Sequence, residues 1–423
     1  MRLWTRTTGL LFVRLSRQLV GIALPYASAL LVLATADIVL PHRTSPETFG
    51  RYQFVRQLAP LVVVFGLLGV DQVIARSYYG ERADRVAWLP LLPRLARATA
   101  VVAAVFCGLS MWRLHLPLAY GAATAFSALA LVVSELTAGY LRAAGSYALA
   151  AFVQQGYRIL LGVFLMLLAA FRLASPGRVV VALVSAPAIV AVMAARALWR
   201  QSLRAENVEQ PHYESMRRIG IPIALAVLGL GAMDWVDQAA LALRTGGLSA
   251  GGIYTSAKIP LSFPAIAVAS IVGFAALPEV AKRLAKVAER RIWWISVFLA
   301  AGASCAINGA VLAVYVSEGH RVLAYPVSNA TALLLVAAGA SRLAYVLPSA
   351  VLGAAGSGRL LYAYAFVSVG ALALEGGWIL LAPIASAVDL AASGLLVAAG
   401  ARLIASLVLA SLSLRPHRVV TPA

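Results

Sequence analysis

Charged residues and cysteines are scarce in this chain of 423 residues. Charged side chains make up 12% of the sequence, and the acidic ones are fewest, with 16 Asp and Glu against 35 Lys and Arg. The two cysteines, Cys107 and Cys305, both lie in apolar runs, which excludes a cysteine framework for disulfides or a metal. The sequence also lacks a GxxxxGK[ST] phosphate-binding loop and a soluble domain to carry one. We therefore expect neither a cofactor nor a resident metal ion.

Hydrophobic residues, by contrast, are abundant and occur in long runs. Hydrophobic residues make up 62% of the sequence and the mean hydropathy is +0.87, far from the averages of soluble domains. Runs of about 18 or more apolar residues suit helices that cross a hydrocarbon core of about 30 Å. The sequence therefore predicts an all-α polytopic membrane protein. We expect twelve spans, at 18–40, 53–76, 95–112, 117–141, 147–171, 178–199, 219–243, 253–281, 292–316, 322–348, 360–382 and 390–412.

The distribution of basic residues predicts the direction of the spans. Of the 35 Lys and Arg, 23 fall in the N-terminus, in alternate loops and in the C-terminal tail, whereas seven fall in the opposite loops. Cytoplasmic loops carry an excess of Lys and Arg, so both termini are expected in the cytoplasm. Basic loops that face anionic lipid also explain the net charge of +19, and nucleic acid is not an expected partner. Before the first span, the segment around Arg14 and Arg17 is expected to be a basic amphipathic helix on the membrane surface.

Basic residues within the predicted spans need a separate explanation. There are five of them, Arg56, Arg158, Lys258, Arg342 and Arg402. Intramembrane charges usually face a bundle interior or a watery cavity, although those near a helix end can reach the interface. Ser45 and Ser249 resemble helix N-caps, which would place Arg56 about 15 Å and Lys258 about 14 Å along their helices, deep enough to line a cavity. Helices that began at Gln53 and Ile253 would instead let both side chains reach the interface. For the other three, pairing within the protein and cavity lining both stay open.

The chain contains an internal repeat. PETFGRYQFVRQLAP at 46–60 aligns with LSAGGIYTSAKIPLS at 248–262, an offset of 202 that pairs Gly50 with Gly252, Tyr52 with Tyr254 and Arg56 with Lys258. LRAAGSY after the fourth span recurs as LGAAGSG after the tenth, at an offset of 211. A parallel duplication of six spans is found in some secondary transporters. The expected organisation is a six-helix lobe at 1–200, a cytoplasmic linker at 201–218, a second lobe at 219–414 and a cytoplasmic tail at 415–423.

Several stretches also point to a known family. They are ETFGRYQFVRQL, GLLGVDQVIARSYYG, LRAAGSYALAAFVQQGYRILLG, VDQAALALRTGGLSAGGIYTSAKIP and ALPEVAKRL. In order and spacing, over nearly the whole chain, they resemble Wzx-type polysaccharide flippases of the multidrug/oligosaccharidyl-lipid/polysaccharide exporter superfamily. The resemblance implies a bacterial inner-membrane protein that is not an enzyme and that moves isoprenoid-diphosphate-linked oligosaccharides from the inner to the outer leaflet. Its implied partners are a polyprenyl-diphosphate-linked glycan, membrane lipids and polysaccharide polymerase or export machinery.

The resemblance also suggests where the substrate binds. In the lipid II flippase relatives, a basic residue on span 8 within a pattern resembling YTSAKIPLSFP lies in the central cavity, which carries over to Lys258. Only the internal repeat extends this role to Arg56. Cations in a low-dielectric, water-filled cleft attract a diphosphate more strongly than in bulk water. Pro260 and Pro264 are expected to bend the helix towards the cavity. The expected substrate-binding set is Lys258, Arg56, Arg158, Arg342, Arg402, Tyr52 and Tyr254, with interfacial anchoring an equal alternative for the tyrosines.

Acidic residues are candidates for ion coupling. These are Asp37, Asp237, Asp71 and Glu135, although no spacing identifies the ion. Asp37 and Asp237, together with Asp234, lie towards the outer ends of their spans, where an aqueous vestibule could hydrate them. Asp71 could pair locally near Arg76, and Glu135 could pair with Arg158 across the first lobe.

Two further functions stay open. A drug or cation antiporter of the same superfamily would need acidic cavity residues, for which Asp37 is the best candidate. A membrane glycosyltransferase or polymerase would need positioned acids or bases and a sizeable outer loop, whereas the outer loops here are short. In either transporter, two six-helix lobes would rock about a central cleft, driven by an ion gradient, the membrane potential or substrate supply.

Overall fold

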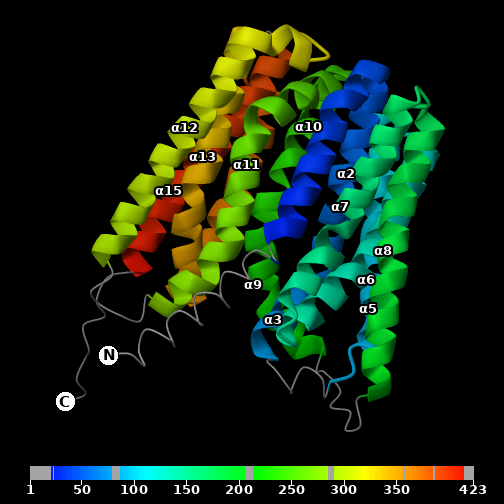
Figure 1. Ribbon diagram of the computed structural model, residues 1–423, viewed down its shortest axis with the longest axis vertical. Coiled ribbons are helices and arrows are strands. Elements are labelled where there is room, and N and C mark those ends of the chain that lie inside the picture. Colours follow the sequence, from blue (N-terminus) through cyan, green and yellow to red (C-terminus); the bar gives the residue numbers. More distant parts are fainter. Residues whose placement is uncertain are drawn as a thin grey trace, which may run out of the picture.

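The structure is a computed structural model. It describes all residues except 1–20, 22, 79–85, 205–212, 284–289, 356–357, 384–385 and 414–423. The regular elements of the described part are helices, so the all-α prediction is confirmed. Figure 1 shows long helices lying side by side, with those of the N-terminal half on one side and α11 to α15 on the other. The expected N-terminal surface helix and the tail at 415–423 lie outside the described residues.

The helices follow the predicted spans closely. The first span covers Ala23–Arg43 and ends in the 3-10 turn η1 (Leu40–Arg43). The N-terminal half continues with α2 (Pro46–Leu67), α3 (Val70–Ser77), η2 (Leu89–Leu91), α5 (Leu92–Leu114), α6 (Leu118–Ala143), α7 (Tyr147–Ala170) and α8 (Pro176–Arg204). The C-terminal half contains α9 (Tyr213–Gly231), α10 (Met233–Thr245), α11 (Ser249–Arg283), α12 (Arg290–Val322), α13 (Asn329–Ala355), α14 (Gly358–Leu381) and α15 (Ala387–Ser413).

Nine helices of the described part are long and apolar enough to cross a membrane. The other predicted spans correspond to α2 with α3, to α9 with α10, and to α11. These exceptions are the spans that contain Arg56, Asp237 and Lys258.

The predicted start of α2 is confirmed. The Ser45 hydroxyl accepts a hydrogen bond from the Thr48 amide at 3.2 Å, and Pro46 is the first helical residue. Ser249, by contrast, is itself the first residue of α11 and not the residue that precedes the helix. At 1.5 Å per residue, Arg56 lies about 15 Å along α2 and Lys258 about 14 Å along α11, as expected.

Two spans that were predicted as continuous helices are broken. Leu68 and Gly69 separate α2 from α3 and both have a positive φ, 47° and 77°. A side chain on Gly69 would overlap the carbonyl oxygen of Gly220 in α9, so both the backbone conformation and the close approach require glycine. Ala232 separates α9 from α10. Discontinuous helices are typical of transporter binding sites because they free backbone groups and change the direction of side chains.

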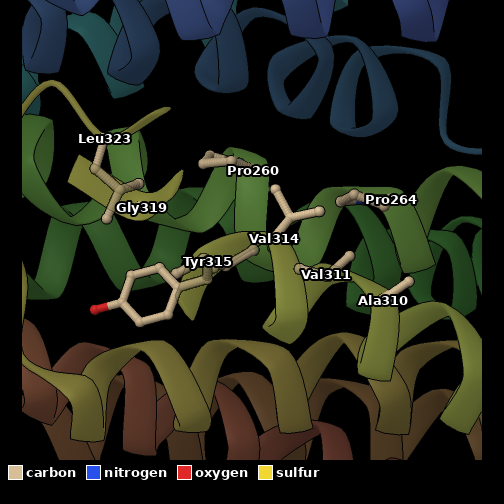
Figure 2. Close-up of a pocket in the computed structure, with 9 residues that line it drawn as sticks. Pro260, Pro264, Ala310, Val311, Val314, Tyr315, Gly319 and Leu323 are labelled. Carbon is tan, nitrogen blue, oxygen red and sulfur yellow. The ribbon is translucent and has the colours of Figure 1, made fainter. Parts of the chain in front are cut away.

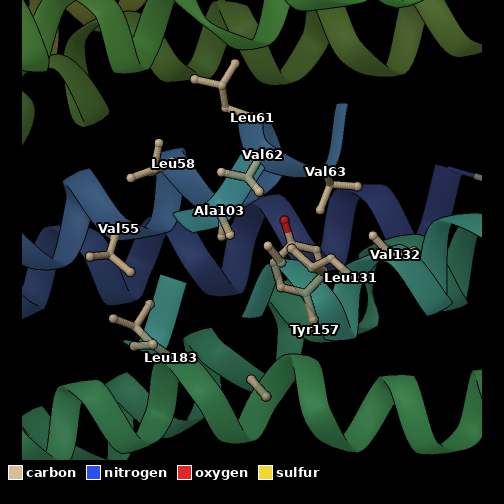
Figure 3. Close-up of a cluster of buried hydrophobic side chains, with 14 of the residues drawn as sticks. Val55, Leu58, Leu61, Val62, Val63, Ala103, Leu131, Val132, Tyr157 and Leu183 are labelled. Atoms are coloured by element: carbon tan, nitrogen blue, oxygen red, sulfur yellow. The ribbon is translucent and has the colours of Figure 1, made fainter. Parts of the chain in front are cut away.

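Two clusters of buried apolar residues form most of the core, and the larger one joins the halves because it also contains Leu228, Leu248 and Ile259 of the C-terminal half. In the N-terminal half, Val62 of α2, Leu131 of α6, Tyr157 of α7 and Leu183 of α8 belong to one cluster (Figure 3). A second cluster joins α10, α11, α13, α14 and α15 in the C-terminal half. Helix α11, which carries Lys258, contributes to both clusters, with Ile259 in the shared one and Leu261 in the C-terminal one.

One backbone contact between the two halves is the approach of Gly69 to Gly220, and another lies where α2 and α11 cross near their first turns. A side chain on Gly252 would overlap the carbonyl oxygen of Pro46, and one on Gly50 would overlap that of Leu248. Gly50 and Gly252 are equivalent positions of the 202-residue repeat, so the duplication places its two glycines at one crossing. Glycine is required here because the two backbones are in direct contact.

A further contact joins the halves at the end where α2 and α11 cross. The Tyr325 hydroxyl, in the connection between α12 and α13, lies 3.0 Å from the carbonyl oxygen of Pro41 and 2.8 Å from that of Thr44. It can donate its proton to either oxygen. The basic-residue asymmetry predicts that this end faces outwards, and we call it the outer end. The structure is therefore closed at its outer end.

We expect cysteine labelling to confirm this orientation. In a protein without Cys107 and Cys305, a cysteine at Gly246, in the turn between α10 and α11, should react with a membrane-impermeant thiol reagent added to intact cells. A cysteine at Arg204, the last residue of α8, should react only after the cells are permeabilised. Reaction at Arg204 from outside would contradict the predicted topology.

Candidate functional site

A buried carboxylate organises the charges of the N-terminal half. Asp37, on the first span, accepts hydrogen bonds on Oδ1 from the Tyr52 hydroxyl at 2.8 Å and from Gln53 at 2.9 Å. Its Oδ2 lies 2.7 Å from Nη1 of Arg56. Asp37 is buried, and 16% of the Arg56 side chain is exposed. Because Tyr52, Gln53 and Arg56 occupy neighbouring turns of α2, the helical repeat brings all three to one carboxylate.

The C-terminal half contains a matching cluster. Oδ2 of Asp237, on α10, accepts from the Tyr254 hydroxyl at 2.8 Å and lies 2.5 Å from Nζ of Lys258 on α11. The same ammonium lies 2.8 Å from Oδ1 of Asp234, one turn earlier on α10. Arg342 of α13 reaches that Asp234 oxygen at 3.0 Å. Two acids and two bases therefore form one connected group.

The two clusters are related by the repeat. Each has a tyrosine four residues before a basic residue, at positions that differ by 202, and both side chains contact a carboxylate from the preceding span. Arg56 lies over the Tyr52 ring at 5.7 Å and Lys258 over the Tyr254 ring at 5.3 Å, a favourable position for a cation. The sequence predicted the tyrosines and the basic residues as equivalents but not the carboxylates between them.

This arrangement differs from the expectation for the acids. Asp37 and Asp237 were expected in a hydrated vestibule, but both are buried and ion-paired. Asp234 is the more open member, with 35% of its side chain exposed. In the conformation of the structure, Lys258 is held between two carboxylates. Its role as a substrate contact stays a prediction.

Arg158 of α7 is bonded to neutral groups. Nε donates to the Tyr157 hydroxyl at 3.0 Å and Nη1 donates to Gln155 at 3.1 Å. Glu135 instead accepts from Gln154 at 3.0 Å, so the predicted ion pair between Glu135 and Arg158 is not formed. Within the described residues, no carboxylate lies within ion-pair distance of Arg158. The half-buried Arg158 is also close enough to Arg56 for the two charges to repel each other.

The remaining predicted residues have separate partners. Asp71 of α3 lies 3.5 Å from Arg142 of α6 and links these two helices. Arg402 of α15 is buried beside Tyr345 and Tyr364, with ring distances of 5.1 and 5.8 Å, and its Nη2 donates to the Tyr364 hydroxyl at 3.3 Å. These contacts favour a packing role for Arg402.

Sequence reasoning did not identify Glu375 of α14. It is fully buried, and neither carboxylate oxygen has a hydrogen-bond partner among the described residues. It lies close enough to Asp237 and Lys258 for electrostatic interaction. The signal was present, because Glu375 interrupts the apolar stretch ALALEGGWILL just as Lys258 interrupts its own. In the part of the chain that the structure describes, no His, Cys, Asp and Glu cluster of three or more could hold a metal ion.

An apolar pocket of about 290 Å³ lies beside the C-terminal cluster, between α11 and α12 (Figure 2). Its lining includes Pro260, Pro264, Val311, Val314 and Leu323. Helix α11 continues unbroken through both prolines. Both line this apolar pocket, and the charged residues of the cluster are not part of its lining.

Comparison with known proteins identifies the fold. No protein-family model matches the chain, and no curated protein matches its sequence. An inward-facing structure of a multidrug resistance MATE family transporter of the MOP superfamily has a TM-score of 0.66 and 14% identity, covering 93% of this chain and 97% of that chain. The eukaryotic MATE transporter AtDTX14 has a TM-score of 0.60 and 13% identity, with coverages of 95% and 96%. An outward-facing MATE structure has a TM-score of 0.57 and 17% identity, with coverages of 94% and 95%. The chain therefore has the fold of MATE transporters along nearly its whole length.

Proposed function

We propose that this protein is an alternating-access transporter that moves an isoprenoid-diphosphate-linked oligosaccharide from the inner to the outer leaflet of a bacterial inner membrane. Three observations support alternating access: the MATE fold, the duplicated halves, and their contact at the outer end through α2 and α11. The proposed partners are the glycan carrier, the surrounding lipid and the polymerase or export machinery that receives the glycan. Both termini would be cytoplasmic.

The observation that favours an anionic substrate is the pair of Arg56 and Arg158. Both side chains are half-buried, and Asp37 is the one carboxylate bonded to either of them within the described residues. Nε of Arg56 and both Nε and Nη2 of Arg342 are buried without a hydrogen-bond partner in that part of the chain. Guanidinium groups with unused N–H donors match the oxygens of a diphosphate in charge and geometry.

In the proposed cycle, the basic residues bind and orient the headgroup and the two halves control access to it. The diphosphate and sugars would lie between the halves, while the polyprenyl chain remains in lipid. Opening the outer end requires α2 and α11 to separate at Gly50 and Gly252 and Tyr325 to release the turn at Pro41 and Thr44. The C-terminal cluster can stay intact during this motion, whereas the larger cluster, which joins both halves, must partly separate.

A specific observation also supports the antiporter alternative. The C-terminal half contains three acids within one electrostatic group, Asp234, Asp237 and Glu375, and the last has no hydrogen-bond partner among the described residues. Such a group could attract a cationic drug or a coupling ion. The two candidate functions therefore differ in the sign of the charge that the cleft binds.

Ligand binding should distinguish these functions. We expect the full-length protein in lipid nanodiscs to bind farnesyl diphosphate, and to bind it more weakly as salt rises because exposed charges are screened. Arg158→Gln should weaken binding about tenfold, since it removes a cation without breaking an ion pair. Arg113→Gln, at an exposed arginine of α5 beside Trp112, is the matched control and should bind like the wild type. Preference for tetraphenylphosphonium over farnesyl diphosphate would contradict the flippase and support the antiporter.

A further inference from the structure

We propose that Asp234 is a resident counter-ion in a phosphoryl subsite formed by Lys258 and Arg342, and that the diphosphate of the substrate displaces it. This inference rests on the proposed function and assigns one part of its binding site. It gives Asp234 a role in selectivity, because an incoming anion must compete with a carboxylate that the protein supplies.

The first support is geometric. A single atom, Oδ1 of Asp234, lies 2.8 Å from Lys258 Nζ and 3.0 Å from Arg342 Nη1. A phosphoryl oxygen placed between the same two donors would make the same contacts. Arg342 also keeps Nε and Nη2 without partners among the described residues. The carboxylate therefore uses only part of the donor set, whereas a phosphoryl group presents three acceptor oxygens.

The second support is the difference between the two acids that contact Lys258. Asp237 is fully buried and is held by Tyr254 as well as Lys258, so it belongs to the permanent structure of the half. Asp234 has 35% of its side chain exposed. Although Oδ1 of Asp234 is itself buried against the two cations, moving this partly exposed carboxylate costs less than moving a fully buried one, because water can replace some of the lost contacts. Of the two acids, Asp234 is the one that can be displaced.

The third support is the departure from the repeat. The N-terminal half has counterparts of Asp237, Tyr254 and Lys258 in Asp37, Tyr52 and Arg56. With Asp37 and Asp237 as equivalents, the position of Asp234 corresponds to Ala34. At the offset of 211, the position of Arg342 corresponds to Leu131. One half folds without this acid and base, so the pair Asp234–Arg342 is an addition to the shared architecture.

A resident counter-ion has a physical purpose at this site. Without Asp234, Lys258 would keep its contact with Asp237, but Arg342 would lose the carboxylate that it touches, in a low-dielectric interior where Glu375 is the other nearby acid. Asp234 neutralises them until the substrate arrives. A weakly charged anion gains too little to replace the carboxylate, whereas a diphosphate has more charge and more acceptor oxygens. The subsite would therefore discriminate against phospholipid headgroups, which carry one phosphodiester charge.

The test is the affinity of Asp234→Asn for farnesyl diphosphate in nanodiscs. Removing the competing charge from an isosteric side chain should tighten binding about tenfold, and should improve binding of inorganic pyrophosphate by a similar factor. Asp237→Asn is the matched contrast. It also removes one negative charge beside Lys258, but it disturbs a buried, tyrosine-bonded position and should not give this gain. Weaker binding of farnesyl diphosphate by Asp234→Asn than by the wild type would overturn the inference.

The outcomes separate this inference from the proposed function. If the wild type binds farnesyl diphosphate and Asp234→Asn binds it less well, Asp234 supports the site and only the counter-ion role fails. If the wild type binds tetraphenylphosphonium instead, and Asp234→Asn loses that binding, Asp234 is a cation ligand and both proposals fail.

A second test uses the wild-type protein, so its result cannot be confused with a folding defect caused by a substitution. A hydrophilic carbodiimide modifies accessible carboxyl groups, and mass spectrometry can locate the product. Farnesyl diphosphate should increase modification of Asp234 severalfold, because the displaced carboxylate leaves its two cations, and should leave buried Asp237 unchanged. Protection of Asp234 by the ligand would contradict displacement.

Discussion

Lys258→Ala is expected to abolish export and also to reduce the amount of inserted protein. From the sequence alone, an apolar replacement would remove only the cost of a lone charge in the membrane. The structure changes that expectation, because Lys258 neutralises Asp237, which is fully buried. Breaking a buried ion pair by removing one partner typically costs about 3–5 kcal/mol, since the other charge is left uncompensated. Complementation of a flippase-null strain, with membrane abundance measured in parallel, tests both effects.

A double substitution separates stability from transport. Lys258→Ala combined with Asp237→Asn removes both charges and should restore abundance, because no unpaired carboxylate remains, but it should not restore export. Lys258→Arg should retain part of the activity, since the charge remains while the donor geometry changes. Normal export by Lys258→Ala at normal abundance would show that the lysine is dispensable.

Gly252→Ala is expected to abolish transport by preventing closure of the outer end. The added methyl group would overlap the carbonyl oxygen of Pro46, and backbone atoms cannot move aside as a flexible side chain can. The closed arrangement therefore becomes less stable than one with α2 and α11 apart. A difference of about 1.4 kcal/mol already changes the ratio of two conformations tenfold. Spin labels at Arg43 and Asn329, exposed residues of opposite halves at this end, should report a longer distance.

Gly251→Ala is the matched control for this experiment. Gly251 is the preceding residue in the first turn of α11, and a methyl group there would meet no atom within 4 Å. It makes the same change to helix propensity, so any difference between the two variants reports the crossing of α2 and α11. Transport by Gly252→Ala at the level of Gly251→Ala would show that this crossing is not a moving contact.

Several features of the site could be predicted because they depend on local sequence. Apolar runs of membrane length identified the spans, and the offset of 202 identified Tyr52 with Tyr254 and Arg56 with Lys258. Basic residues inside apolar runs are conspicuous because lipid cannot solvate them. Applied to acids, the same rule would have identified Glu375 as well. The helix start at Ser45 was predictable because capping uses neighbouring residues only.

The partners of these charges could not be predicted in the same way. Asp234 and Arg342 are 108 positions apart, and their contact depends on how α10 and α13 pack together. The break at Leu68 and Gly69 escaped detection because the second apolar run continues through it, and the close approach of Gly220 in α9 that requires glycine there is a tertiary contact.

The sequence by itself therefore determined the membrane location, the helical class, the duplication and the residues that bring charge into the spans. The hydropathy and charge of a segment decide whether that segment is more stable in lipid or in water, so both effects can be predicted from the local sequence. Only the tertiary structure decided that Lys258 and Arg56 are neutralised by Asp237 and Asp37, and that Arg158 has no carboxylate within ion-pair distance among the described residues. The energy of a charge in a low-dielectric interior depends on the groups within a few ångströms, and helix packing selects those groups from distant parts of the chain.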